Sequence, residues 1–295
     1  MGVLKNDVGR PSNKTIMIRK ILKVTLLIIL MVIVFIVGYL LKDYQNKNSK
    51  TETIKTEELD ISSKEILDLY EPFTVYMHEA SDEELYFKDK VTPDDLSIEY
   101  KNRLAFAKYV NETSLDDLYD GTEVIDEQYN VEVSYLKSSK LEKYYKKLFG
   151  KESKYVAKTF DAYNIRTLSM DYDEKKDIYY ETPEGGDYTG YRYGHELFRA
   201  VKSGNRIYLY EYVVVYNEDY MKDIVGVYAN LEDANNFENA IRQINGYGGH
   251  DTLMKFNENN YSDDLSDYKD KASKYKLTFE KEDNNYVFKQ IEKIK

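Results

Sequence analysis

The sequence predicts an α+β protein, in which an N-terminal transmembrane helix precedes helices packed on a curved antiparallel sheet. Three observations lead to this prediction. An uninterrupted apolar run stands near the N-terminus, the next hydrophobic residues recur every three or four positions, and from about residue 165 they alternate every two. Because the helical segments come first and the hairpins follow, one layer of helices on one sheet is the expected architecture.

The apolar run covers residues 24–41, with Val24 and Leu41 at its ends, and its 18 residues carry no charge. A helix of that length covers about 27 Å, close to the thickness of the hydrocarbon core of a bilayer. Six basic residues and one acid precede it, so the positive-inside bias places the N-terminus in the cytoplasm. A cleaved signal peptide is the alternative, but residues 38–42 offer no pair of small residues to a peptidase. We therefore expect a retained single-pass anchor in the cell membrane, which makes the lipid bilayer the first partner.

The charge of the chain limits which molecules can be its other partners. The basic stub of residues 1–23 offsets part of the acidity, so residues 42–295 carry −16 against −11 for the whole chain. Such a domain repels nucleic acid, which we exclude as a partner. The chain contains no cysteine, which excludes disulfides, thiolate metal sites, cysteine nucleophiles and a lipoprotein anchor. The exported domain must therefore be held together by its apolar core.

Residues 42–60 are polar and without periodicity, which predicts a flexible tether before an extracytoplasmic domain at residues 61–295. The first helix is expected near Ser63. A second is expected after Thr92, which can cap a helix whose first position is Pro93. A third is expected from the capping box that Ser139 opens, and Gly150 is its predicted end.

Segments with alternating hydrophobic residues predict three hairpins: residues 165–171 with 178–181, residues 193–201 with 207–216, and residues 275–279 with 286–288. Ser203-Gly204-Asn205 is the expected turn of the second hairpin. Between the second and third hairpins, apolar residues recur at helical spacing over residues 231–244, which predicts one more helix, ending at Asn245-Gly246. Nuclear-transport-factor-2-like (NTF2-like) and cystatin-like topologies share this order of elements, so the comparison is an analogy.

The predicted strand at residues 207–216 carries the candidate ligand-binding residues, Tyr208, Tyr210 and Tyr212. They share one face of the strand and could stack on the sugar rings of a wall glycan. Packing against the helical layer is the favoured alternative, because both faces of this strand look covered, as in a central strand. An AT-rich codon bias also accounts for part of the 31 tyrosines of the chain.

No motif predicts a catalytic residue, a metal site or a cofactor. His195-Glu196 begins like a zinc-protease motif, but Arg199 occupies the place of the second histidine and the segment reads as a strand. The glycines of residues 246–249 follow a predicted helix, so they do not form a phosphate-binding loop at a helix N-terminus. The acidic and amide-rich residues 257–264 have calcium-ligand chemistry, but loop solvation is the favoured interpretation.

Three segments of the chain are similar to segments of other proteins: Asp94-Asp95-Leu96-Ser97 before a predicted helix, Leu148-Phe149-Gly150-Lys151 at the end of another, and the C-terminal hairpin. In these segments the chain resembles uncharacterised, membrane-anchored exported proteins of low-GC Gram-positive bacteria. The likeness spans most of the exported domain, and its motifs are structural. It implies a location and an intact domain, and no activity.

Together these features predict a membrane-anchored extracytoplasmic domain that binds another envelope protein or a wall glycan, without catalysis. The first alternative is a scaffold subunit of a conjugation or secretion assembly, because a short cytoplasmic stub and an NTF2-like outer domain resemble VirB8-like scaffolds. The second alternative is a cell-wall hydrolase that uses two carboxylates.

Overall fold

The computed structural model describes Met31, Gly38 and residues 56–74, 84–126, 131–162, 169–182, 191–219, 221, 223–245, 256–257 and 262–295. The chain divides into two compact units, Met1–Ile54 and Lys55–Lys295. Apart from Met31 and Gly38, the predicted anchor and cytoplasmic stub lie outside the described residues. None of the helices assigned within the described ranges combines the length and apolar composition of a membrane span.

The larger unit is α+β, with antiparallel sheets and few helices. Its strands form two main sheets, where the sequence led us to expect one. The large sheet has the order β1-β8-β9-β14-β15-β2, and β10 and β11 extend it beside β9. The small sheet has the order β3-β4-β7-β6-β5, and β12 and β13 form a separate pair.

The elements have the following bounds. The strands of the large sheet are β1 (Thr56–Leu59), β2 (Lys90–Val91), β8 (Tyr191–Ser203), β9 (Arg206–Asp219), β10 (Ile224–Tyr228), β11 (Arg242–Asn245), β14 (Ser273–Glu282) and β15 (Asn285–Ile294). Those of the small sheet are β3 (Gly121–Asp126), β4 (Val131–Lys137), β5 (Phe160–Asp161), β6 (Ser169–Asp173) and β7 (Ile178–Thr182), and the separate pair is β12 (Phe256–Asn257) with β13 (Ser262–Asp263). The helices are α2 (Lys64–Tyr70), α3 (Ile98–Glu112), α4 (Ser138–Phe149) and α5 (Leu231–Asn236), with short 3-10 turns η1 (Glu71–Phe73), η3 (Pro93–Asp95) and η4 (Leu115–Asp117).

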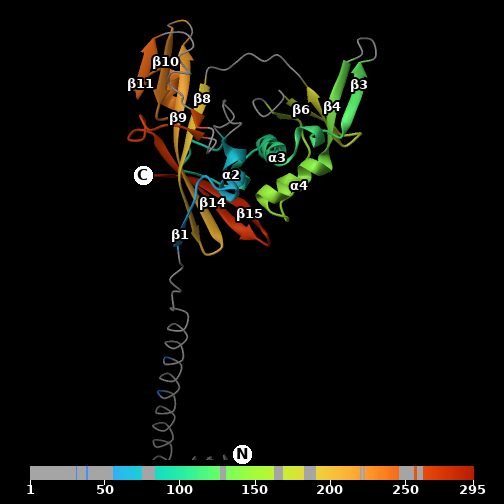
Figure 1. Cartoon of the computed structure of the whole chain (residues 1–295), viewed down its shortest axis with the longest axis horizontal. Helices are drawn as coiled ribbons and strands as arrows, with labels where there is room; N and C mark the ends of the chain where they lie inside the picture. The colour runs from blue at the N-terminus through green and yellow to red at the C-terminus, as the bar shows by residue number, and fades with distance from the viewer. Residues whose placement is uncertain are drawn as a thin grey trace, which may run out of the picture. The chain divides into compact units, whose positions relative to one another are not determined.

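The helices α2, α3 and α4 lie between the two sheets (Figure 1). Helix α4 contacts β15 of the large sheet and β4 of the small sheet, and α3 contacts α4, η1 and β5. Buried residues of α2, α3 and α4 share one core with buried residues of both sheets, so each sheet packs one of its faces against the helices. The main core therefore joins the helices to both sheets.

All three predicted hairpins form, as β6 with β7, β8 with β9, and β14 with β15. The tight turn between β8 and β9 contains Gly204, whose φ of 61° is one that side chains rarely adopt. Strand β9 pairs with β8 on one side and with β14 and β10 on the other, so it is central, as its pattern indicated. Residues 56–59 of the expected tether form β1, which pairs with β8.

Two helix starts differ from their predictions. Thr92 forms a capping box with Asp95, as expected. Only the 3-10 turn η3 follows it, because Leu96 returns to an extended conformation. Helix α3 begins at Ile98, and Tyr100 N–H donates to Ser97 Oγ at 3.1 Å. Helix α4 begins at Ser138, so no capping box forms at Ser139, which is already helical. Its predicted end at Gly150 is confirmed by a φ of 97°.

The helix predicted over residues 231–244 is wrong beyond its first turns. Helix α5 ends at Asn236, and Phe237 takes a left-handed conformation with a φ of 55°. Residues 242–245 become strand β11, in which Ile244 stands opposite Val225 of β10. Asparagine favours helix interiors weakly, and the edge of β10 offers the chain backbone hydrogen bonds that a helix would have to outcompete.

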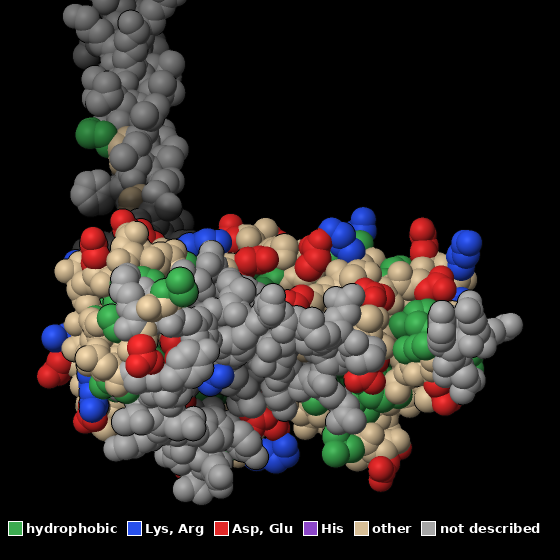
Figure 2. All heavy atoms as spheres, turned by 90° about the horizontal axis from the view of Figure 1, so that it is seen from above, with side chains coloured by type: hydrophobic (Ala, Val, Ile, Leu, Met, Phe, Trp, Pro, Cys, Tyr) green, Lys and Arg blue, Asp and Glu red, His purple; other side chains and the backbone are tan. Residues whose placement is uncertain are grey.

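The main core contains a cluster of three phenylalanine rings. The Phe73 centroid lies 5.7 Å from that of Phe279 and 4.8 Å from that of Phe288, in edge-on and tilted contacts. Ile207 and Leu209 of β9 join the same core, as the alternation of that strand predicted. Most charged side chains lie at the surface, with Glu211 and Arg103 among the buried exceptions, and Figure 2 shows acidic and basic groups interspersed on one face of the molecule.

Candidate functional site

The three candidate tyrosines of β9 lie on the face of the large sheet that points away from the main core. Tyr208, Tyr210 and Tyr212 are all half-buried, whereas Ile207 and Leu209, on the other face, are fully buried. Further along the same strand, Val214 and Tyr216 are covered by a second apolar cluster. The helical layer packs on the face of Ile207 and Leu209, so it does not cover the tyrosine row, and within the row Tyr212 packs against the second cluster.

Phe198 of β8 extends the row. Its ring centroid lies 4.3 Å from that of Tyr212 and 6.3 Å from that of Tyr210, both in tilted contacts. We call the surface formed by Phe198, Tyr208, Tyr210 and Tyr212 the tyrosine face. Sequence reasoning missed Phe198, because its position beside Tyr210 and Tyr212 depends on how β8 pairs with β9.

Cations surround the tyrosine face. Arg199 lies over Tyr210, with its guanidinium carbon 5.3 Å from the ring centroid. The ammonium groups of Lys269 and Lys274 lie 5.9 and 5.7 Å from the Tyr212 centroid. That of Lys276 lies 5.5 Å from the Tyr208 centroid. Such cation–π contacts orient the rings and fix them at the surface.

Most of these cations also have carboxylate partners. Arg199 pairs with Glu58 of β1, Lys269 with Glu196 of β8, and Lys276 with Glu292 of β15. The hydrogen bond from Arg199 lowers the pKa of Glu58 below its usual value. The rim of the tyrosine face therefore offers both hydrogen-bond donors and acceptors while remaining almost neutral.

A buried polar cluster lies under the opposite face of β9. The carboxylate of Glu211 accepts hydrogen bonds from the hydroxyls of Tyr70 at 2.9 Å and Tyr86 at 2.8 Å, and His195 Nδ1 lies 3.3 Å from its Oε2. Burial raises the pKa of Tyr70, and the charge of Glu211 raises it further, so this hydroxyl remains a donor. Glu211 is fully buried, which makes the cluster a link between α2, the segment of Tyr86, β8 and β9.

The segment that follows β12 docks on the large sheet through carboxylates. Asp263 is buried and accepts a hydrogen bond from His195 N–H at 2.9 Å. Nearby, Glu196 accepts one from Leu265 N–H at 2.8 Å. Burial raises the pKa of Asp263 to about 6. Asp263 belongs to the acidic residues 257–264, for which a calcium site was considered. In the structure, its carboxylate attaches strand β13 to β8 through His195 N–H.

Asp263→Asn is expected to remove a pH dependence of stability. The folded protein disfavours the ionised carboxyl, so the stability linked to its neutral form is present below about pH 4 and is lost as pH rises through about 6. Asparagine keeps an acceptor for His195 N–H without the charge. The variant should match the parent at about pH 4 and exceed its free energy of unfolding by about 3 kcal/mol above pH 6. Urea unfolding at both pH values measures this, and a pH-independent difference would contradict it.

His195-Glu196 was not expected to be a zinc-protease motif, because its segment was predicted to be a strand. In the structure these two residues lie in strand β8. Successive strand residues point to opposite faces, and His195 meets Glu211 in the core while Glu196 pairs with Lys269. Within the described ranges, no three metal-ligating side chains gather. His78 and His250 lie outside those ranges.

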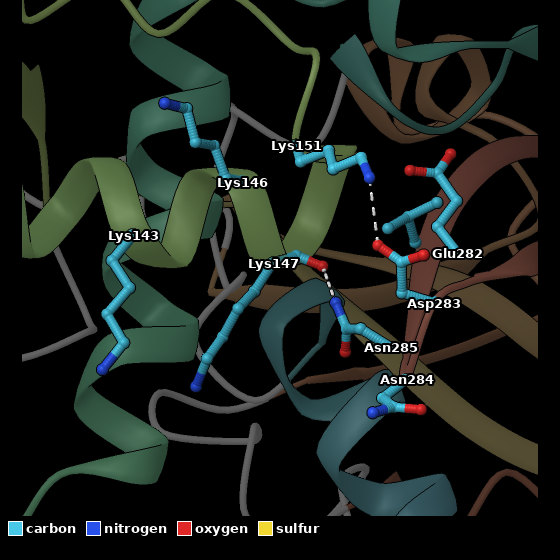
Figure 3. Close-up of a pocket in the computed structure, with 9 residues that line it drawn as sticks. Lys143, Lys146, Lys147, Lys151, Glu282, Asp283, Asn284 and Asn285 are labelled. Carbon is cyan, nitrogen blue, oxygen red and sulfur yellow. Dashed lines mark hydrogen bonds and ion pairs between the residues drawn. The ribbon is translucent and has the colours of Figure 1, made fainter.

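A separate pocket of about 350 Å³ opens where α4 ends beside the turn between β14 and β15. Lysines from α4 and its end line one wall, and the turn lines the other (Figure 3). Its lining residues are Lys143, Lys146, Lys147, Lys151, Glu282, Asp283, Asn284, Asn285 and Val287. Sequence reasoning missed it, because no local pattern brings residues 143–151 together with 282–287.

Comparison with known proteins finds no matching family model, no similar curated protein and no matching solved structure. The features of the described residues that bear on function are the tyrosine face, the buried Glu211 cluster and the lysine-lined pocket.

Proposed function

We propose that this protein is a membrane-anchored extracytoplasmic binding domain whose tyrosine face takes a neutral wall glycan. The observation that carries the proposal is the row of Tyr208, Tyr210 and Tyr212, which is half-exposed and aligned along one strand. Alternate strand residues stand about 6.6 Å apart, so the three rings form a linear platform for an extended chain of sugar rings.

The rim of the face supports a neutral ligand rather than a polyanion. Arg199, Lys269 and Lys276 are each bound to a carboxylate, so a negatively charged polymer would have to displace those carboxylates. Sugar hydroxyls both donate and accept hydrogen bonds, and such ion pairs offer both roles at once. Carbohydrate stacking on aromatic rings with a polar rim is therefore the chemistry that this surface fits.

The location of the domain belongs to the same proposal. The apolar run of residues 24–41 is the proposed span, with a cytoplasmic N-terminus and the α+β unit outside. An NTF2-like or cystatin-like topology is proposed by analogy, and helices on one face of the large sheet support it. A short tether would then hold the tyrosine face within reach of the wall.

Binding of the full-length protein in detergent to purified insoluble peptidoglycan tests the proposal by co-sedimentation. Tyr210→Ala is expected to weaken binding by at least about tenfold, because it removes the central stacking ring. Tyr210→Phe keeps the ring and should stay within about twofold of the parent. Tyr180→Ala, on the small sheet, is the matched control and should leave binding unchanged.

Two outcomes would overturn the assignment. Equal retention of Tyr210→Ala and the parent would show that the tyrosine face does not bind the glycan, and failure of the parent to sediment would remove the glycan as ligand. Release of soluble sugar fragments in the same assay would favour the cell-wall hydrolase instead.

A further inference from the structure

The segment at residues 137–158 concentrates positive charge in an acidic protein. It contains eight lysines and only two acids, Glu142 and Glu152, in a chain whose net charge is −11. Half of these lysines line the pocket at the end of α4. A local excess of one charge in a concave site raises the concentration of ligands of the opposite charge. This pocket shares no residue with the tyrosine face.

Two lysines of the pocket present their ammonium groups on the same side of α4. Lys143 and Lys147 are four residues apart and extend in the same direction (Figure 3). Their Nζ atoms lie 5.8 and 4.2 Å from the centroid of the Tyr144 ring. Like charges at this spacing repel each other and destabilise a helix, so an anion between them would be stabilising.

Lys143 is the cation that is most available to a ligand. Lys147 pairs with Glu112 of α3, whereas Lys143 is exposed and has no carboxylate within ion-pair distance in the described part of the chain. The acids that face the pocket are matched by other lysines: Asp283 by Lys151 at 3.1 Å and Glu282 by Lys289 at 2.6 Å. The charge of Lys143 is therefore left over for a ligand.

The opposite wall adds amide groups. Asn284 and Asn285 belong to the turn between β14 and β15. The Asn285 side-chain amide donates a hydrogen bond to the backbone carbonyl of Lys147, which fixes the turn on the end of α4. The pocket volume of about 350 Å³ falls in the range of small-molecule sites.

We propose that this pocket binds a phosphate monoester group, with Lys143 and Lys147 as its cationic contacts and Asn284 as a further donor. A phosphate monoester carries up to about two negative charges and three acceptor oxygens at neutral pH. Its oxygens can therefore accept hydrogen bonds from more than one of these donors. A carboxylate carries only about half that charge and two acceptor oxygens, so the phosphate monoester is the stronger match for this lysine-rich wall. Phosphate binding in this pocket is a second activity, separate from glycan stacking on the tyrosine face, and it does not depend on that stacking.

Isothermal titration calorimetry tests the site. Glycerol 3-phosphate is titrated into the full-length protein in detergent at about 0.15 M ionic strength. Glycerol 3-phosphate should bind and uncharged glycerol should not. Lys143→Glu should weaken binding by at least about tenfold, because it replaces an attractive contact with a repulsive one. The matched control is Lys154→Glu, a charge reversal at an exposed lysine that does not line the pocket, and it should change affinity by less than about twofold.

Parallel titrations identify the source of the phosphate. Equal affinity for inorganic phosphate would assign the site to the free ion, whereas tighter binding of the ester would assign it to an organic phosphate. Absence of glycerol 3-phosphate binding would overturn the proposal, as would equal weakening by Lys154→Glu, which indicates diffuse attraction. Binding only to phosphatidylglycerol vesicles would also overturn it, in favour of a membrane surface. Unchanged urea midpoints of both variants ensure that a loss of affinity reports the site.

Discussion

Glu211→Ala is expected to lower the free energy of unfolding by about 4 kcal/mol, since breaking a buried charged network costs about 3–5 kcal/mol. The substitution leaves the hydroxyls of Tyr70 and Tyr86 buried without the acceptor that they share. It also opens a cavity beneath β9, where Glu211 is fully buried. Urea unfolding of the full-length chain, followed by far-UV circular dichroism, measures the loss.

Two further variants separate the hydrogen bonds from the volume of the side chain. Glu211→Gln keeps the size and can meet both hydroxyls, because each tyrosine can accept as well as donate, so a loss of only about 1 kcal/mol is expected. The combination of Glu211→Leu with Tyr70→Phe and Tyr86→Phe removes both hydroxyls together with their shared acceptor, leaves the His195 ring in place, and should recover part of the stability. A loss below about 1 kcal/mol for Glu211→Ala would show that the cluster contributes little.

Phe73→Ala is expected to lower the free energy of unfolding by about 3–5 kcal/mol, the usual cost of deleting a buried phenylalanine ring. Phe73 is fully buried and joins η1 to the hairpin of β14 and β15 through the rings of Phe279 and Phe288. Because three elements meet at this ring, little of the cavity can be filled by relaxation. The measurement is again the shift of the urea midpoint at constant slope.

Matched controls make the core prediction specific. Phe73→Leu keeps most of the apolar volume and should cost only about 1.5 kcal/mol. Leu115→Ala removes a leucine that is 67% exposed, and its effect should stay within about 0.5 kcal/mol. If Phe73→Ala cost no more than Leu115→Ala, the aromatic cluster would not be the centre of the core.

Much of the fold follows from local pattern. The period of two predicted the hairpins β6 with β7, β8 with β9, and β14 with β15, and the glycine at position 150 predicted the end of α4. Such signals work because side-chain alternation and left-handed glycines act within a few residues. The hairpin of β3 and β4 was missed, because its exposed apolar residues, among them Val124 and Ile125, do not alternate clearly with polar ones.

The candidate sites were less predictable than the fold. The tyrosine row could be read from its alternation, but whether Tyr210 is covered or exposed depends on what packs on the outer face of β9. Glu211, the one acid within the apolar run of that strand, was a visible signal of a buried polar cluster. Its partners Tyr70 and Tyr86 come from segments more than 100 residues away, and no local pattern identifies them.

The sequence by itself determined the α+β class, the hairpins and the absence of thiol chemistry, because these depend on composition and on short-range periodicity. Only the tertiary structure decided that there are two sheets, that residues 242–245 are a strand, and that Lys147 meets Asn285 across a pocket. The physical reason is that strand pairing and pocket formation depend on contacts between distant residues. Their energies compete with local propensity, and at the edge of β10 the long-range backbone hydrogen bonds prevail over the helical spacing.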